Sequence, residues 1–186
     1  MKRFALLLLV VSLSAGAQPR REPVPPQFLR GHSLVVLAGN FSIDAPDPSW
    51  QWELLRPSQP DPSSLGTYVC LNPTDGAYFV VTVHSFKATR VDATFLDGFL
   101  TEARSIGPDV AASLQHQTVD TPLQGSVRYR YAQAPASGRV QHTYGYIVAT
   151  GRAVTIFTLS ASDQEPPGLK AFAGSLRLLR PHPSAA

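Results

Sequence analysis

Two neighbouring stretches, Val127-Arg-Tyr-Arg-Tyr131 and Val140-Gln-His-Thr-Tyr-Gly-Tyr146, decide the fold expected for this chain. In both, large side chains alternate with polar or small ones, which is the two-residue period of a β-strand. Directly opposed residues of an antiparallel pair share one face of the sheet. Matching the rings to one another puts on one face Val127, Tyr129, Tyr131, Val140, His142, Tyr144 and Tyr146. The other face then carries Arg128, Arg130, Gln141 and Thr143.

A third strand at 153–159 follows the tight turn Thr150-Gly-Arg152. Its register adds Phe157 and Leu159 to the ring face. It adds Val154 and Ile156 to the opposite face. The pattern therefore predicts one face that is fully covered and a second face that is covered at one end and polar at the other.

Patterns elsewhere in the chain predict the remaining strands and helices. Apolar and β-branched runs predict further strands at 34–37, 41–43, 52–55, 67–71, 78–86 and 114–119. Thr89-x-x-Asp92 can start a helix through a capping box, and Gly107-Pro108 ends it. Pro166-Pro167 opens a last helix that runs to about 176. The proline-rich stretch 56–66 is expected to be an exposed loop.

The first residues have the layout of a secretory signal peptide. Lys2 and Arg3 precede a short apolar run, and Ala15-Gly-Ala17 offers small residues at a cleavage site. We therefore expect residues 1–17 to be a signal peptide and the protein to be secreted or periplasmic. The apolar run is too short to cross a bilayer, so no membrane anchor is expected after removal of the leader.

The expected mature chain has one domain, with a flexible segment before it and another after it. Residues 18–30 are rich in proline and charge, which predicts a flexible tether. Residues 31–180 form the domain, and 181–186 a disordered tail. The chain has 16 Lys and Arg and 13 Asp and Glu; two of the bases lie in the leader, which leaves 14 against 13. A nearly neutral domain lacks the basic footprint of a nucleic-acid binder.

Several residues carry the resemblance of this chain to a known family. They are Gly39-Asn-Phe-Ser-Ile-Asp-Ala-Pro46 with Trp50, Leu123-x-Gly125, and Leu169-x-x-Phe172-x-x-Ser175-Leu176. Over about 31–180 the chain resembles the PsbP-like family, which includes extrinsic subunits of photosystem II and exported bacterial relatives. The resemblance implies an α/β fold, an α/β/α sandwich with a mainly antiparallel central sheet, and it supplies no shared catalytic residues.

Motifs of catalysis are missing from the sequence. It has no phosphate-binding glycine loop, nucleophile elbow or zinc-ligand spacing, so we expect no metal and no cofactor. Cys70 is the only cysteine, and we interpret it as a buried strand residue. The expected function is a non-catalytic module that binds an unknown envelope protein through Arg128, Arg130, Gln141 and Thr143. The oligomeric state stays open.

Two alternatives belong to other classes of function. The tyrosines of the ring face could line a pocket for a ring-bearing ligand, which would make the protein a small-ligand carrier. Cys70 with His84 is the best available pair for a hydrolase. Against both, buried cysteines and covered aromatic faces are usual features of a core.

Overall fold

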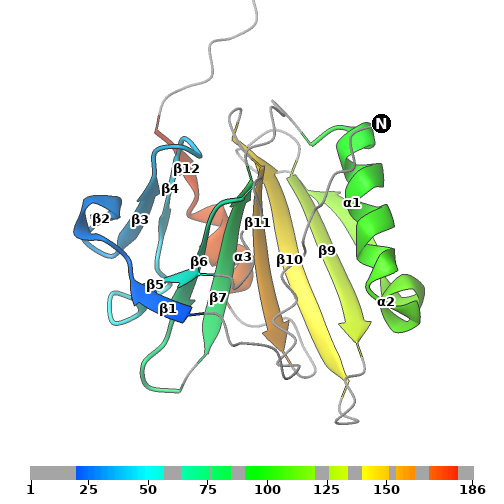
Figure 1. Cartoon of the computed structure of the whole chain (residues 1–186), viewed down its shortest axis with the longest axis horizontal. Helices are drawn as coiled ribbons and strands as arrows, with labels where there is room; N and C mark the ends of the chain where they lie inside the picture. Colours follow the sequence, from blue (N-terminus) through cyan, green and yellow to red (C-terminus); the bar gives the residue numbers. More distant parts are fainter. Residues whose placement is uncertain are drawn as a thin grey trace, which may run out of the picture.

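A large antiparallel sheet dominates the computed structural model, which describes residues 20–56, 64–75, 77–84, 91–119, 126–133, 140–150, 154–161 and 168–179. The sheet has eight strands in the order β1-β5-β6-β7-β11-β10-β9-β8 (Figure 1). They are β1 Arg20–Pro23, β5 Gln51–Arg56, β6 Ser64–Leu71, β7 Tyr78–His84, β8 Gln115–Val119, β9 Ser126–Gln133, β10 Gln141–Ala149 and β11 Val154–Ala161.

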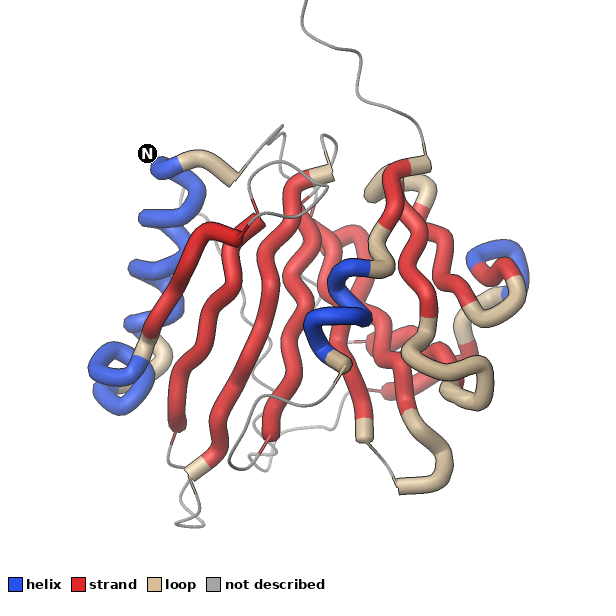
Figure 2. Tube along the Cα trace, turned by 180° about the vertical axis from the view of Figure 1, so that it is seen from behind, coloured by secondary structure: helices blue, strands red, loops and turns tan. Residues whose placement is uncertain are grey.

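A smaller sheet and the described helices complete the structure. The second sheet has the order β12-β4-β3-β2, with β2 Leu29–Arg30, β3 Ser33–Val36, β4 Phe41–Asp44 and β12 Arg177–Leu178. The helices are the short 3-10 turn η1 Pro26–Phe28 and the α-helices α1 Ala93–Ser105, α2 Pro108–Ser113 and α3 Leu169–Gly174. In Figure 2, α3 lies in front of the large sheet and α1 behind it.

The large sheet has an apolar core on each of its faces. On the face that we call the α1 face, Phe99 of α1 meets the Tyr129 ring edge-on at 5.1 Å between centroids. The opposite α3 face packs against α3 and the small sheet, and Phe172 of α3 stacks on Phe79 at 4.6 Å. Helices thus contact both faces, and the expected mixed α/β fold with mainly antiparallel strands is confirmed.

The expected helix at 89–107 is present and is followed by one more. Asp92 is the N-cap of α1, and its carboxylate accepts a hydrogen bond from the Phe95 N–H at 2.9 Å. Thr89 lies outside the described residues. Gly107-Pro108 ends α1 as expected, but Pro108 also starts α2, because a proline suits the first turn of a helix.

The expected tether at 18–30 is wrong for residues 20–30. Arg20–Pro23 form β1, which pairs with β5, and Val24 is buried in the main core. The ion pairs Arg21–Glu53 at 3.4 Å and Arg56–Glu22 at 3.3 Å join the two strands. Prolines fit here because β1 is an edge strand, where a missing N–H costs no ladder hydrogen bond.

Other expectations fall partly or wholly outside the described residues. Residues 1–17, 181–186 and the Leu123-x-Gly125 motif lie outside them. So does 57–63 of the expected proline loop, whereas Ser64–Gly66 belong to β6.

The residues behind the family resemblance form one structural junction. The Ser175 hydroxyl accepts a hydrogen bond from the Asp44 N–H at 3.1 Å, and the Leu179 N–H donates to the Asn40 carbonyl at 3.0 Å. The Thr150 hydroxyl donates to the Gly39 carbonyl. A Cβ on Gly39 would lie 2.7 Å from the Phe41 ring, so this turn requires glycine. These residues hold the small sheet against α3 and β10.

Candidate functional site

The register of β9 and β10 differs from the sequence prediction by one residue. Tyr144 lies opposite Arg130, and Tyr146 lies opposite Arg128. Gly145 lies opposite Tyr129. Because opposed residues share a face, the predicted single ring face is wrong: Tyr129 and Tyr131 face α1, whereas Tyr144 and Tyr146 face α3.

The two cores explain why this register is preferred. Both faces of β10 are buried from Thr143 to Ala149, so rings are useful on either face. Gly145 has no side chain, which leaves room on the α1 face for the Tyr129 ring beneath Phe99. By contrast, the predicted register of β10 with β11 is confirmed, with Phe157 opposite Tyr146 and Leu159 opposite Tyr144.

The predicted binding surface is therefore divided. Arg128 and Arg130 lie on the α3 face, whereas Gln141 and Thr143 lie on the α1 face. Thr143 is 5% exposed and belongs to the interior. Gln141 is exposed at the start of β10. The structure keeps the arginine pair together and separates it from the other two residues.

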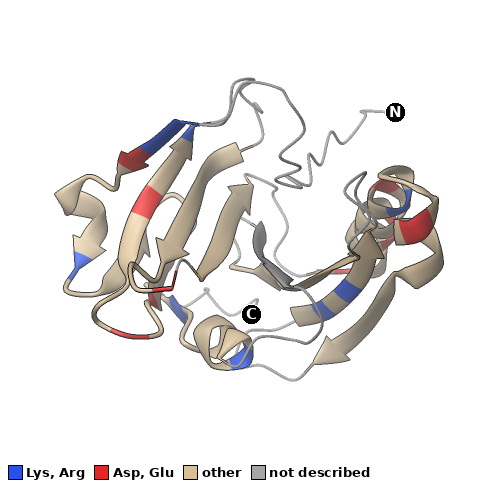
Figure 3. Cartoon of the chain, turned by 90° about the horizontal axis from the view of Figure 1, so that it is seen from below, with Lys and Arg blue, Asp and Glu red and all other residues tan. Residues whose placement is uncertain are grey.

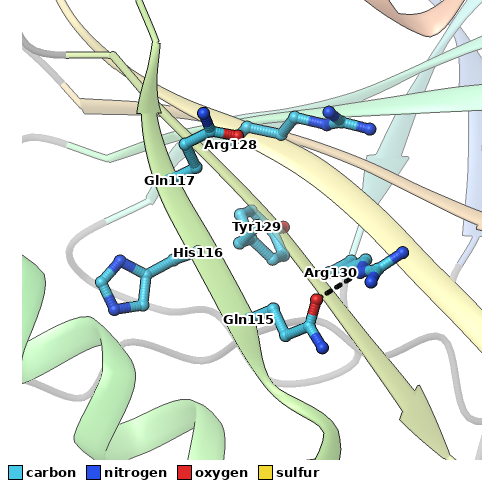
Figure 4. Close-up of a pocket in the computed structure, with 6 residues that line it drawn as sticks. All are labelled: Gln115, His116, Gln117, Arg128, Tyr129 and Arg130. Carbon is cyan, nitrogen blue, oxygen red and sulfur yellow. Dashed lines mark hydrogen bonds between the residues drawn. The ribbon is translucent and has the colours of Figure 1, made fainter.

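A different pair of glutamines lies beside the arginines. Gln115 is opposite Arg130 and Gln117 is opposite Arg128 in the β8–β9 ladder. The Arg130 Nε–H donates to the Gln115 Oε1 at 2.8 Å (Figure 4). The four side chains form a two-by-two polar array on the α3 face of the last two strands.

This array borders an open hollow of about 310 Å³. The hollow is lined by Gln115, His116, Gln117, Arg128, Tyr129 and Arg130, which we call the basic hollow. Among the described residues of its lining, two are arginines and none is acidic. Figure 3 shows blue on β9, and red on the helices at the same end of the molecule. The basic hollow is therefore suited to carboxylate or phosphate groups, which arginine binds in a forked geometry.

Sequence reasoning missed the two glutamines. They alternate at 115 and 117 with the same period as the arginines at 128 and 130. Pairing the strand at 114–119 with the arginine strand would have placed them together. The segment between those two strands has no two-residue turn signal, so the sequence gives no sign that they pair.

Cys70 is confirmed as a buried residue. It has no exposed surface, and burial raises the pKa of its thiol to about 12. The hydrolase pair is wrong on geometry: Cys70 lies opposite Phe79, whereas His84 lies opposite Ser64. Five residues of strand β7 separate Phe79 from His84, which is about 17 Å at the usual rise. A thiolate and an imidazole so far apart do not form a catalytic dyad.

The tyrosines do not line a common pocket. Tyr129, Tyr131, Tyr144 and Tyr146 are between 1% and 6% exposed and belong to two separate cores. Burial raises the pKa of Tyr131, and a hydrogen bond with Thr143 lowers it by less. These rings stabilise the fold.

The described part of the chain was compared with the requirements of two other kinds of feature, a metal site and a membrane-spanning helix. Within it, no three His, Cys, Asp or Glu side chains gather closely enough to hold a metal ion. None of its helices is both long and apolar enough to cross a bilayer.

Known proteins resemble this chain only weakly. No protein-family model matches the chain, and no curated protein matches it. A solved structure from Bacteroides thetaiotaomicron VPI-5482 is similar over 81% of this chain and 49% of its own, at 10% identity and a TM-score of 0.49. This chain thus spans about half the length of that protein.

Proposed function

We propose that this protein is an exported, non-catalytic binding module of the cell envelope that holds an acidic partner protein at the basic hollow. The observation that carries the proposal is the arginine pair at 128 and 130, which lie side by side on one face and line the basic hollow. Arginines spaced by two strand residues present two forks to the same partner. Such a surface favours partners of opposite charge and rejects basic ones.

The leader and the fold support the cellular setting. The layout of residues 1–17 is typical of an export signal, which supports a setting outside the cytoplasm. The antiparallel sheet with helices on both faces suits the PsbP-like sandwich that the sequence resembles. The residues of that resemblance serve the junction between the small sheet, α3 and β10, so they account for folding and leave binding to the other end of the sheet.

The alternatives have less support. A ligand carrier would need exposed rings, and the four tyrosines are buried. A hydrolase would need a nucleophile beside a base, and Cys70 is remote from His84 along the strands.

The test is a quantitative pull-down from envelope extract of the source cells. Immobilised wild-type protein is compared with Arg128→Glu/Arg130→Glu and with the control Arg30→Glu/Arg104→Glu, which makes the same charge change at exposed sites elsewhere. We expect one acidic protein to be retained by wild type and control and released from the first variant. Equal retention by all three would refute the basic hollow as the binding site.

A further inference from the structure

Strand β8 forms an edge of the large sheet in the part of the chain that the structure describes. It is last in the strand order, and among the described strands only β9 pairs with it. The first four of its side chains are exposed, from Gln115 to Thr118. In an antiparallel ladder every second residue directs its N–H and C=O away from its partner strand. The outer side of β8 therefore offers a row of backbone donors and acceptors.

The sequence of β8 lacks the usual protection of an edge. Natural edge strands avoid pairing with other chains through charged side chains, prolines or bulges. Gln115-His-Gln-Thr-Val119 contains no proline, lysine, arginine or acid. The register of β8 with β9 runs through all five residues without a bulge.

The basic hollow lies directly beside this edge. Arg130 already reaches a side chain of β8, as its hydrogen bond to Gln115 shows (Figure 4). A strand added to β8 would place alternate side chains on the α3 face, next to Gln115 and Gln117. Those side chains would be spaced by about 6.6 Å, like the arginines themselves. Acidic side chains at alternate positions would thus meet both arginines in register.

We propose that β8 is a docking edge for an extended acidic segment of the partner protein, which adds a ninth strand and directs alternate Asp or Glu residues toward Arg128 and Arg130. This inference rests on the proposed function and names the kind of partner and its binding mode. In strand addition the main chain supplies affinity and the side-chain positions supply specificity. The charge of the hollow selects the occupant.

A second copy of this chain fits the edge less well. Antiparallel pairing of β8 with its own copy places both α3 faces on the same side of a continuous sheet. The two basic hollows would then share one surface, with no acidic β8 side chain between them. An acidic segment brings opposite charge to the same place, so charge complementarity favours it.

Synthetic peptides test this mode of binding. The probe is a fluorescent peptide of four Glu-Thr repeats, in which glutamates alternate and threonine favours extended structure. Controls are four Gln-Thr repeats and two N-methylated forms of the acidic peptide, one methylated at every glutamate amide and one at every threonine amide. In an added strand only one of these two sets of amides faces β8.

Binding is measured by fluorescence anisotropy with the purified full chain. We expect one N-methylated form and the neutral peptide to bind at least about tenfold more weakly than the probe, and the other N-methylated form to bind within about threefold of it. Hydrogen exchange should slow at the amides of β8 on binding and stay unchanged at β1, the opposite edge. Arg128→Gln/Arg130→Gln should weaken the probe by about tenfold.

Three results would overturn the inference. If both N-methylated peptides bind like the probe, the contact is made by charge alone, and the basic hollow stands without strand addition. If the neutral peptide binds as tightly, the occupant is not acidic. If no peptide binds, the edge is not a docking site, and the pull-down decides the proposed function separately.

Discussion

The two edges of the large sheet are built in opposite ways. At one edge, β1 reads Arg20-Arg-Glu-Pro23, and its charges pair with Glu53 and Arg56 of β5. At the other, β8 reads Gln115-His-Gln-Thr-Val119 and contains no Lys, Arg, Asp or Glu. The α3 face also differs between its two ends. Near β5, β6 and β7 it is covered by the small sheet and α3, which belong to the same core. At β8 and β9 it carries the basic hollow. We call the end of the sheet at β1, β5, β6 and β7 the closed end, and the end at β8 and β9 the open end.

The difference separates stability from binding. Rings and apolar side chains at the closed end are packed on each other, so changes there alter the free energy of unfolding. Polar groups on the α3 side of the open end lie outside the apolar cores, so we expect changes there to alter binding with little effect on folding. Substitutions at the two ends can test this separation of stability from binding.

Phe172→Ala should weaken the closed end most. The ring stacks on Phe79 at 4.6 Å and is 2% exposed, so its removal leaves a cavity and should lower the free energy of unfolding by about 3–5 kcal/mol. Denaturant unfolding measures the loss. Lys170→Ala on the exposed side of the same helix is the control. A loss below about 1 kcal/mol would show that α3 does not hold this end of the sheet.

Cys70 should make the closed end sensitive to alkali. Its thiol has a pKa of about 12 in the fold against 9.0 as the reference value for the free group, so between these pH values only the unfolded chain loses the proton. Stability should then fall as pH rises, by up to about 1.4 kcal/mol per pH unit above 9 from this group. Cys70→Ala removes that contribution, and unfolding curves at pH 9 and 10 compare the two proteins. Parallel pH dependence would mean that the thiol is accessible.

Asp92→Ala should weaken the covered side of the open end. Asp92 caps α1, which supplies Phe99 to the α1 face, and loss of an N-cap costs about 1 kcal/mol. Asp97→Ala, an exposed acid inside the same helix, separates capping from charge. Thermal unfolding of both variants checks this, and equal losses would refute the capping role.

Arg128→Gln/Arg130→Gln should have the smallest effect on folding. Neither arginine lies in the apolar cores, so we expect a change of about 0.5 kcal/mol or less in the free energy of unfolding. The same variant should lose the acidic partner. A protein that unfolds instead would make the pair part of the structural core and end the contrast between the two edges.

Much of the fold follows from sequence patterns, and the error at β9 has a physical cause. Sequence patterns placed nine of the twelve described strands and missed β1, β2 and β12. The tight turn at 150–152 predicted the register of β10 with β11 correctly. Between β9 and β10 the rule that rings gather on one face failed, because the sheet has a core on each side. Alternation fixes the register of a strand only when one of its faces is polar.

Two of the four residues predicted for the candidate site, Arg128 and Arg130, lie together in the structure. The alternation in Val127-Arg-Tyr-Arg-Tyr131 placed both arginines on one face, which the structure confirms. The wrong register gave them the partners Gln141 and Thr143 in place of Gln115 and Gln117. The proline-rich start was misread because proline content alone does not distinguish a tether from an edge strand.

The junction at Asp44 and Ser175 also has a kinetic consequence. These residues are separated by 131 positions, and β4 receives its outer neighbour β12 from the end of the described chain. Contacts between such distant positions make folding slow, because a long loop must close before they form. If the chain is exported as we propose, this delay would help it to cross the membrane unfolded, because the small sheet cannot close until its last strand is available.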